Sequence, residues 1–461
     1  MLHRSAPVAA TLALLATSSI GYGADLGGNC CADLEERIAE LEATMVRKGN
    51  RKLSLEIYGQ INEAVLFWDD GVESNAHIVT NDNARSRVGF RGKAKINDDW
   101  EAGYRLEIGV RSVNSKRFTQ NDPKALADSG LDMRDSHWYL KSKTFGAAYV
   151  GLGTSATNMI TELNLSQTAS FSKYSDVEDS GLGLLLRSAT NGRLSALSWR
   201  RLIGDGGDQP GEGERALNLV RYESPTLWGF TASGSWGEDD IWDVALRYAG
   251  EAAGFKYTAG IGYGVVLDDG QTQTVCAGTI ATGGSDTRCN NLGGSISIMH
   301  EETGLFANIG AGRKVDDIID DMPLFAGTGA DDEQTFWAAQ VGIEKKFNSF
   351  GKTTVYGEYY SYEGGANGRR TVDGPDGGAA DALNPFATGG DSAIFASGVD
   401  MYGAGIAQGF DDAALLVYLS YRHYEADLTL RQIVGGSATG AVADVALDDL
   451  DIVMTGAMIK F

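Results

Sequence analysis

Residues 453–461 read Val-Met-Thr-Gly-Ala-Met-Ile-Lys-Phe and decide the fold. Alternate positions from Val453 to Phe461 carry Val, Thr, Ala, Ile and Phe, and a repeat of two is the side-chain period of a β-strand. A strand that ends the chain on an aromatic residue favours a closed barrel, because pairing of the last strand with the first removes the open sheet edge. We therefore expect an all-β fold in which one antiparallel sheet closes on itself.

The same alternation continues through most of the chain. From Leu53 onward, Leu55, Ile57 and Ile61 share one parity, while polar side chains hold the other. The chain lacks the roughly 18 continuous apolar residues that a membrane-spanning helix needs. A membrane β-barrel escapes that test because its lipid-facing side chains alternate with lumen-facing ones. The alternation therefore predicts a transmembrane antiparallel β-barrel.

The connections between the expected strands alternate in length. Short turns are expected at 97–99, 191–192, 250–254, 301–304, 348–351 and 409–412. Long polar loops are expected at 69–83, 112–133, 154–183, 266–291, 313–334, 363–398 and 425–444. Short turns on one side and long loops on the other are typical of outer-membrane barrels. Counting strands between the connections gives about 18, with 16 within the accuracy of the boundaries, and one barrel from 51 to 461.

The first residues indicate export. Residues 1–23 contain Arg4, an apolar core at 8–16 and the small-x-small pattern Gly21-Tyr22-Gly23, which together predict a signal peptide. Residues 24–50 then carry a heptad stripe of apolar side chains with charged flanks. The stripe consists of Leu34, Ile38, Leu41 and Met45. It predicts a short periplasmic helix, either a coiled coil between chains or an amphipathic helix on its own barrel.

Four cysteines remain for an oxidising compartment. Cys276 and Cys289 share the polar stretch 271–291, and we expect a disulfide that closes this loop. No histidine or second cysteine pair stands nearby, so zinc is disfavoured. The adjacent Cys30 and Cys31 could pair between subunits or stay reduced.

A net charge of −23 argues against nucleic-acid binding, yet one stretch is strongly basic. In residues 85–96 the odd positions carry Arg85, Arg87, Arg91, Lys93 and Lys95, and Arg105 follows on the next expected strand. Val88 and Phe90 lie on the opposite face. Cations that face lipid would cost ~2–4 kcal/mol each near the midplane, so these side chains are expected to face a water-filled lumen. The alternative is a salt-bridged strand face of a soluble protein.

The sequence contains few patterns that are typical of catalytic sites. The five histidines are scattered at positions 3, 77, 137, 300 and 423, and neither a zinc-protease motif nor a nucleophile elbow is present. We expect no enzyme activity, no cofactor and no metal site.

Several short motifs resemble the general trimeric porins of Gram-negative bacteria. The run Ser86–Gly92 is similar to that family's second strand, the 139–153 hairpin to the strands before its constriction loop, and Tyr222–Phe230 to a periplasmic turn. The helix followed by residues 48–51 resembles alphaproteobacterial members. The resemblance implies an outer-membrane homotrimer, in contact with lipid and lipopolysaccharide, for passive diffusion of small hydrophilic solutes and ions.

The resemblance also implies a long third loop, here 154–183, folded into the barrel. Its acids are Glu162, Asp176, Glu178 and Asp179, which would face the basic wall of Arg85, Arg87, Arg91, Lys93 and Arg105 across a constriction. The alternative is a loop that covers the barrel rim.

Two other functions stay open on the sequence. In the first, the basic wall makes the protein an anion channel selective for phosphate-like oxyanions. In the second, the barrel anchors a structural envelope protein, and the segment near residue 24 holds the outer membrane to peptidoglycan.

Overall fold

The computed structural model describes residues 53–124, 130–203, 209–213, 215–237, 241–267, 289–375, 379–386 and 389–461. The chain divides into two units after residue 51, and the described residues belong to the second unit, 52–461. The expected signal peptide, the expected helix at 24–50, Cys30 and Cys31 therefore lie outside the described residues. Among the described residues, no helix has both the length and the apolar character of a membrane span.

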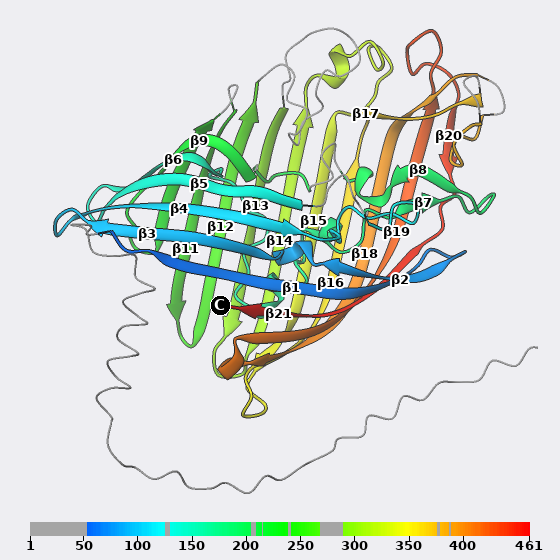
Figure 1. Ribbon diagram of the computed structural model, residues 1–461. Helices are drawn as coiled ribbons and strands as arrows, with labels where there is room; N and C mark the ends of the chain where they lie inside the picture. Colours follow the sequence, from blue (N-terminus) through cyan, green and yellow to red (C-terminus); the bar gives the residue numbers. More distant parts are fainter. Residues whose placement is uncertain are drawn as a thin grey trace, which may run out of the picture. The chain divides into compact units, whose positions relative to one another are not determined.

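The second unit is a closed antiparallel barrel (Figure 1). Its strands follow one another in chain order: β1 (Glu56–Asp69), β3 (Arg87–Lys95), β4 (Trp100–Arg111), β5 (Gly130–Ser142), β6 (Gly146–Thr154), β9 (Arg215–Glu223), β10 (Phe230–Gly237), β11 (Ile241–Ala252), β12 (Phe255–Val266), β13 (Cys289–His300), β14 (Leu305–Asp316), β15 (Glu333–Lys345), β16 (Thr353–Gly364), β18 (Ser392–Phe410), β19 (Leu415–Gln432) and β21 (Leu450–Lys460). The last strand pairs with the first, from Gln60↔Lys460 to Asp69↔Asp451, and closes the sheet. The barrel has 16 strands, so the predicted fold is confirmed at the lower end of its strand count.

Two of the described strands outside the barrel wall explain the difference from a count of 18. They are β7 (Leu185–Arg187) and β8 (Leu194–Ser198), which form a separate two-stranded sheet. Three others extend barrel strands beyond the wall: β2 (Ser74–Thr80), β17 (Asn367–Val372) and β20 (Val442–Val445). The expected barrel turn at 191–192 is wrong, because Asn191 and Gly192 lie in the tight turn between β7 and β8. The third loop therefore runs from 155 to 214 instead of ending at 183.

Alternation decides which side chains face outward. On β15, Trp337 and Val341 are half exposed, while Gln340 between them is fully buried inside the barrel. Ile261 of β12 and Ile309 of β14 show the same outward exposure. An apolar outer face with a polar inner face is the pattern of a barrel that has lipid outside and water within.

The interior has two unlike sides. On the packed side, along β15 to β21 and β1, the third loop fills the lumen with η3 (Gln167–Ser170), η4 (Val177–Asp179), β7, β8 and η5 (Trp199–Arg201). Phe171 stacks on Tyr418 with 4.9 Å between ring centroids, and Trp199 packs on Tyr424. On the basic side, along β3, β4, β5, β6 and β9, the lumen holds a large cavity.

Short 3-10 helices lie in two of the long loops and in one of the short turns. They are η1 (Asp82–Ala84) in the first loop, η6 (Ile319–Asp321) in the sixth and η8 (Asp411–Ala413) in the last turn. The β7–β8 hairpin is bound to three other loops: Arg187 pairs with Asp70 at 2.7 Å, Ala189 N–H donates to Ala446 O, and Asn191 donates to Ala382 O. The hairpin therefore covers the loop end of the packed side.

Candidate pore constriction

A cavity of about 1480 Å³ follows the basic side of the lumen. Its lining begins at the turn end of the barrel, which is the end where the short turns connect the strands, with Ser54, Lys93 and Lys460. It continues to Arg201 and Glu212 of the third loop. The cavity therefore connects the turn end of the barrel with the third loop.

The lining of this cavity is basic although the chain is acidic. Its described residues include fifteen cations, namely Arg85, Arg87, Arg91, Lys93, Arg105, Arg111, Lys116, Arg117, Arg134, Lys141, Lys173, Arg200, Arg201, Arg221 and Lys460. They include nine acids, namely Glu56, Asp82, Glu101, Asp132, Asp135, Glu162, Asp176, Asp179 and Glu212. The protein as a whole has a net charge of −23, whereas the described lining of the cavity has more cations than acids.

Three arginines of the wall converge on one buried carboxylate. Glu107 of β4 is fully buried, with Arg105 Nη2 at 2.6 Å, Arg134 Nε at 2.8 Å and Arg87 Nε at 3.8 Å from its oxygens. The Tyr58 hydroxyl donates to the same carboxylate at 2.9 Å. Asp135 Oδ2 lies 3.4 Å from Arg105 Nε, so two carboxylates face three guanidinium groups and the group keeps an excess of positive charge.

The other predicted wall cations also line the cavity, each paired with a nearby carboxylate. Arg85 lies 3.0 Å from Asp132 Oδ2, and Lys93 lies 3.8 Å from Glu101 Oε2. Arg91 Nε donates to Glu56 at 2.9 Å. Arg85 precedes β3, which begins at Arg87, so the expectation that it lies within the basic strand is wrong. Arg85 instead directly follows η1, a 3-10 turn in the first loop.

Residues 155–183 of the third loop lie inside the barrel. Their hydrogen-bond partners on the wall are Asp243 of β11, Ser295 and Ser297 of β13, Gln340 and Glu344 of β15, Glu358 of β16 and Arg422 of β19. Ser297 and Gln340 are fully buried within their strands. The loop is therefore fixed to the inner wall, as the resemblance implies, and does not merely cover the rim.

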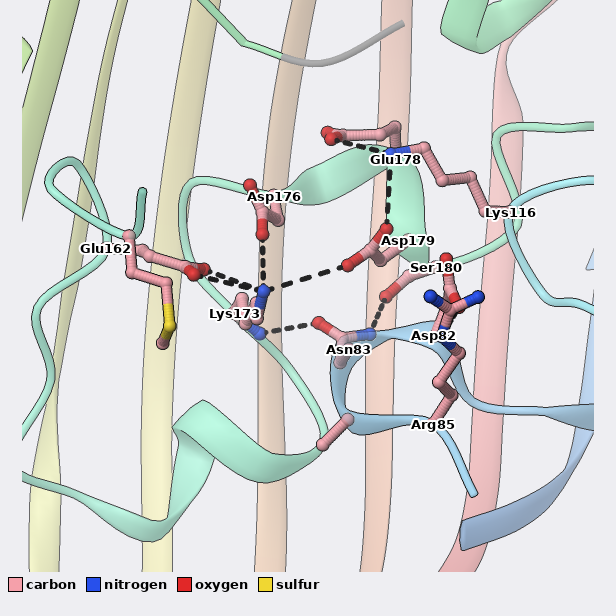
Figure 2. A network of polar contacts seen from close by, with 12 residues as sticks. Asp82, Asn83, Arg85, Lys116, Glu162, Lys173, Asp176, Glu178, Asp179 and Ser180 are labelled. Carbon is pink, nitrogen blue, oxygen red and sulfur yellow. Dashed lines mark hydrogen bonds and ion pairs between the residues drawn. The ribbon is translucent and has the colours of Figure 1, made fainter. Parts of the chain in front are cut away.

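The four loop acids meet two lysines rather than the wall arginines (Figure 2). Lys173 Nζ lies 2.9 Å from Glu162, 2.5 Å from Asp176 and 3.9 Å from Asp179. Glu178 and Asp179 lie 3.3 and 3.5 Å from Lys116 Nζ, which the second loop supplies. The loop acids were expected to face the wall arginines directly. Instead, the loop acids form ion pairs with the two lysines, and the wall arginines form ion pairs with carboxylates of the wall.

Burial changes the acidity of the loop carboxyls. It raises the pKa of Asp179 to about 7, although Lys116 opposes the change. It also raises the pKa of Glu212 to about 7, with the charge of Asp176 acting in the same direction. Burial raises the pKa of Glu162 well above its usual range. Negative charge on the loop side of the cavity therefore depends on pH near neutrality.

Sequence reasoning missed the partners that complete each ion pair. Lys173 is the one lysine or arginine in the expected loop 154–183, which holds four acids, and this imbalance is a usable signal. Asp132 and Arg134 lie on β5 beside β4, so extending the lumen parity by one more strand would have indicated them. Lys116 carries no comparable signal, because its place depends on how the second loop folds.

Cys289 at the start of β13 is buried and disulfide-bonded. Its expected partner, Cys276, lies outside the described residues, so the pairing of these two cysteines stays a prediction. Within the described part of the chain, no cluster of three or more histidine, cysteine, aspartate or glutamate side chains has the arrangement of a metal site.

A closed barrel with an apolar outer face, an inward loop and a charged internal cavity defines an outer-membrane channel. The family model described as Gram-negative porin matches residues 9–376, and the chain belongs to this family. It is located in the outer membrane and conducts small hydrophilic solutes and ions by passive diffusion.

Solved structures of outer-membrane proteins are similar to this chain at low sequence identity. The anion-selective porin from Comamonas acidovorans has 15% identity and a TM-score of 0.51, over 89% of this chain and 100% of that one. OmpT, an outer-membrane protein of Vibrio cholerae, has 14% identity and a TM-score of 0.49, over 90% and 99%. OmpF of Salmonella typhi, in complex with daunomycin, has 14% identity and a TM-score of 0.48, over 90% and 100%. No curated protein gives a significant sequence match.

Proposed function

We propose that this porin prefers anions among the small hydrophilic solutes that it admits. The observation that carries the proposal is the excess of fifteen cations over nine acids in the described lining of the cavity. Low-dielectric walls strengthen the field of lining charges and raise the local concentration of ions of opposite sign. Anions are therefore enriched along the basic side, and cations are depleted.

The strongest attraction is expected at Glu107, where Arg87, Arg105 and Arg134 share one carboxylate. The carboxylate holds the guanidinium groups together despite their mutual repulsion, and the surplus charge faces the cavity. Arg87 and Arg105, the two more exposed of the three, are ordered by their ion pairs, so they can bind passing anions with little loss of side-chain entropy.

Reversal potentials in planar bilayers under a KCl gradient test the proposal. The expected result is a Cl⁻ permeability greater than that of K⁺. A ratio at or below unity would contradict the anion preference while leaving the channel intact. Liposome swelling with sugars of increasing size measures the passage of neutral solutes independently.

The oligomeric state and the role of the N-terminal segment, both predicted from the sequence, are also part of this proposal. We propose a homotrimer, which family membership and the half-exposed apolar outer wall support. Migration of the unheated, detergent-solubilised protein as a species of three times the monomer mass would test it.

The alphaproteobacterial type, the coiled coil and peptidoglycan contact depend on residues 24–50, which lie outside the described residues. If deletion of 25–48 causes envelope blebbing while solute uptake stays intact, the result would support a link between the outer membrane and peptidoglycan.

A further inference from the structure

A pair of tyrosines lies among the charged side chains on the basic side of the lumen. Tyr139 of β5 and Tyr149 of β6 are opposite one another in the register of the two strands, and their ring centroids lie 5.8 Å apart. Both side chains are half-buried and line the cavity. An aromatic surface of two rings therefore borders the path through the barrel.

The ring of Tyr139 lies along the barrel wall. Tyr139 is opposite Gly103 of β4, and the ring is so close to this glycine that a Cβ there would have no room. Tyr58 of β1 covers Gly89 of β3 in the same way. A ring that lies along the wall turns one face toward the lumen, and such a face can stack on another planar group.

Guanidinium groups cover the rings of two of these three tyrosines. Arg91 lies over Tyr58 with 4.9 Å to the ring centroid, and Arg221 lies over Tyr149 with 4.6 Å. Among the described residues, no arginine or lysine lies over the ring of Tyr139 in this manner. Tyr139 is therefore the ring that is left to bind a planar group from solution.

A cation without a carboxylate partner follows Tyr139 on the same strand face. Lys141 is two residues further along β5, about 7 Å away, and both side chains line the cavity. Lys141 is exposed, and no described carboxylate lies within ion-pair distance of it. Its cross-strand neighbour Glu101 pairs with Lys93 at 3.8 Å instead. The ammonium of Lys141 can therefore bind an anionic group beside the ring.

We propose that Tyr139 and Lys141 form a binding site for aromatic carboxylates on the basic side of the lumen. The ring of the solute stacks on Tyr139 beside Tyr149, and its carboxylate binds the ammonium of Lys141, whose flexible stem follows it. This inference names a solute class for the proposed anion-preferring channel and rests on that function for the entry of anions. The preference for an aromatic ring is an independent claim.

Benzoate and cyclohexanecarboxylate test the site, because they have the same charge and similar size but only benzoate is aromatic. Each is added at mildly alkaline pH to planar bilayers that conduct KCl. Benzoate should halve the single-channel conductance of the native protein at about one third of the concentration that cyclohexanecarboxylate needs. In Tyr139→Leu the two probes should become equal, and in Tyr139→Phe the difference should remain, because the ring is kept.

Lys141→Gln separates the charge from the ring. It should weaken the block by both probes by a similar factor, since the contact with the ammonium does not depend on aromaticity. Tyr263→Leu is the matched control: Tyr263 of β12 is 38% exposed on the outer face and is not among the residues that line the cavity. This variant should respond to both probes as the native protein does.

Equal block of the native channel by the two probes would overturn the inference, even if the channel prefers anions. Stronger block by benzoate in a channel without anion preference would keep the site and refute the proposed function. A difference between the probes that persists in Tyr139→Leu, or an unchanged benzoate block in Lys141→Gln, would also overturn the inference. If Tyr139→Leu does not assemble, the two probes on the native protein and on Lys141→Gln still decide the outcome.

Discussion

The two sides of the lumen are built from the same alternating strands but are filled differently. Along β15 to β19 the inward positions include Tyr360, Tyr418 and Tyr424, which pack against apolar residues of the third loop. Along β3 to β9 the inward positions include arginines and carboxylates, and no segment of the described chain packs over them as an apolar core. The difference shows that one strand pattern can produce a dry half and a wet half, depending on which lumen-facing side chains the loop can cover.

The largest expected effect lies on the packed side. Arg422 and Glu358 form an ion pair of 2.8 Å with both side chains at most 2% exposed. Arg422→Met leaves Glu358 buried without its cation, and we expect a loss of about 3–5 kcal/mol of stability. Urea unfolding in detergent measures the change.

Two variants provide the controls for Arg422→Met. Arg313→Met removes an exposed partner of Glu333 and should have little effect. Arg422→Met with Glu358→Gln should recover part of the stability, because no unpaired charge then remains buried. Equal stability of Arg422→Met and the native protein would show that this pair does not hold the third loop.

The next effect lies on the basic side. Arg87→Gln with Arg105→Gln removes two of the three arginines at Glu107, and we expect the Cl⁻ to K⁺ permeability ratio to fall about threefold or more. Reversal potentials under a salt gradient measure it. An unchanged ratio would mean that ions do not pass beside Glu107.

A smaller effect is expected from pH. The pKa of Asp179 and that of Glu212 are both raised to about 7 by burial, so these carboxyls are neutral in acid and gain negative charge as the pH rises through neutrality. Lys116, Lys173, Asp176 and Asp82 are the charged groups around Asp179. The anion preference should therefore be about twofold greater near pH 5.5 than near pH 8.5.

Reversal potentials across that range measure the pH effect. Asp179→Asn with Glu212→Gln should flatten the profile. An anion preference that rises with pH would contradict the assigned direction.

The smallest effect is expected at the turn end. Arg91 and Glu56 are both more than half exposed, so solvent screens their pair. Arg91→Gln should leave the unfolding midpoint unchanged and shift selectivity far less than Arg87→Gln with Arg105→Gln. A selectivity shift as large as that of the double variant would move the constriction from Glu107 to the turn end.

The sequence predicts the barrel well because each lipid-exposed strand needs the same alternation of apolar and polar side chains, whatever the other strands contain. The alternation around Val453 and Leu53 needs no knowledge of the rest of the molecule. The hairpin at Asn191 is wrongly predicted to belong to the barrel wall. Its turn and flanking apolar residues resemble those of a barrel hairpin, but the apolar residues are buried by the third loop and not by lipid. Only long-range packing distinguishes the two cases.

The site is predicted in part for the same reason. Strand parity predicts that Arg87, Lys93 and Arg105 face the lumen, and all three line the cavity. The partners of the loop acids depend on the path of a long loop inside the barrel, which no local pattern encodes. Sequence periodicity therefore predicts which cations line the cavity better than it predicts their partners, and their role in a constriction stays a prediction.

Thiol accessibility tests the division of the lumen most directly. Ser170, the last residue of η3, lines the cavity, whereas Ser420 is buried inside the packed side. With the native protein as background, a negatively charged methanethiosulfonate should react with Ser170→Cys and reduce its conductance, and leave Ser420→Cys unmodified. Equal modification of the two cysteines, or faster modification of Ser420→Cys, would contradict a channel that follows the basic side.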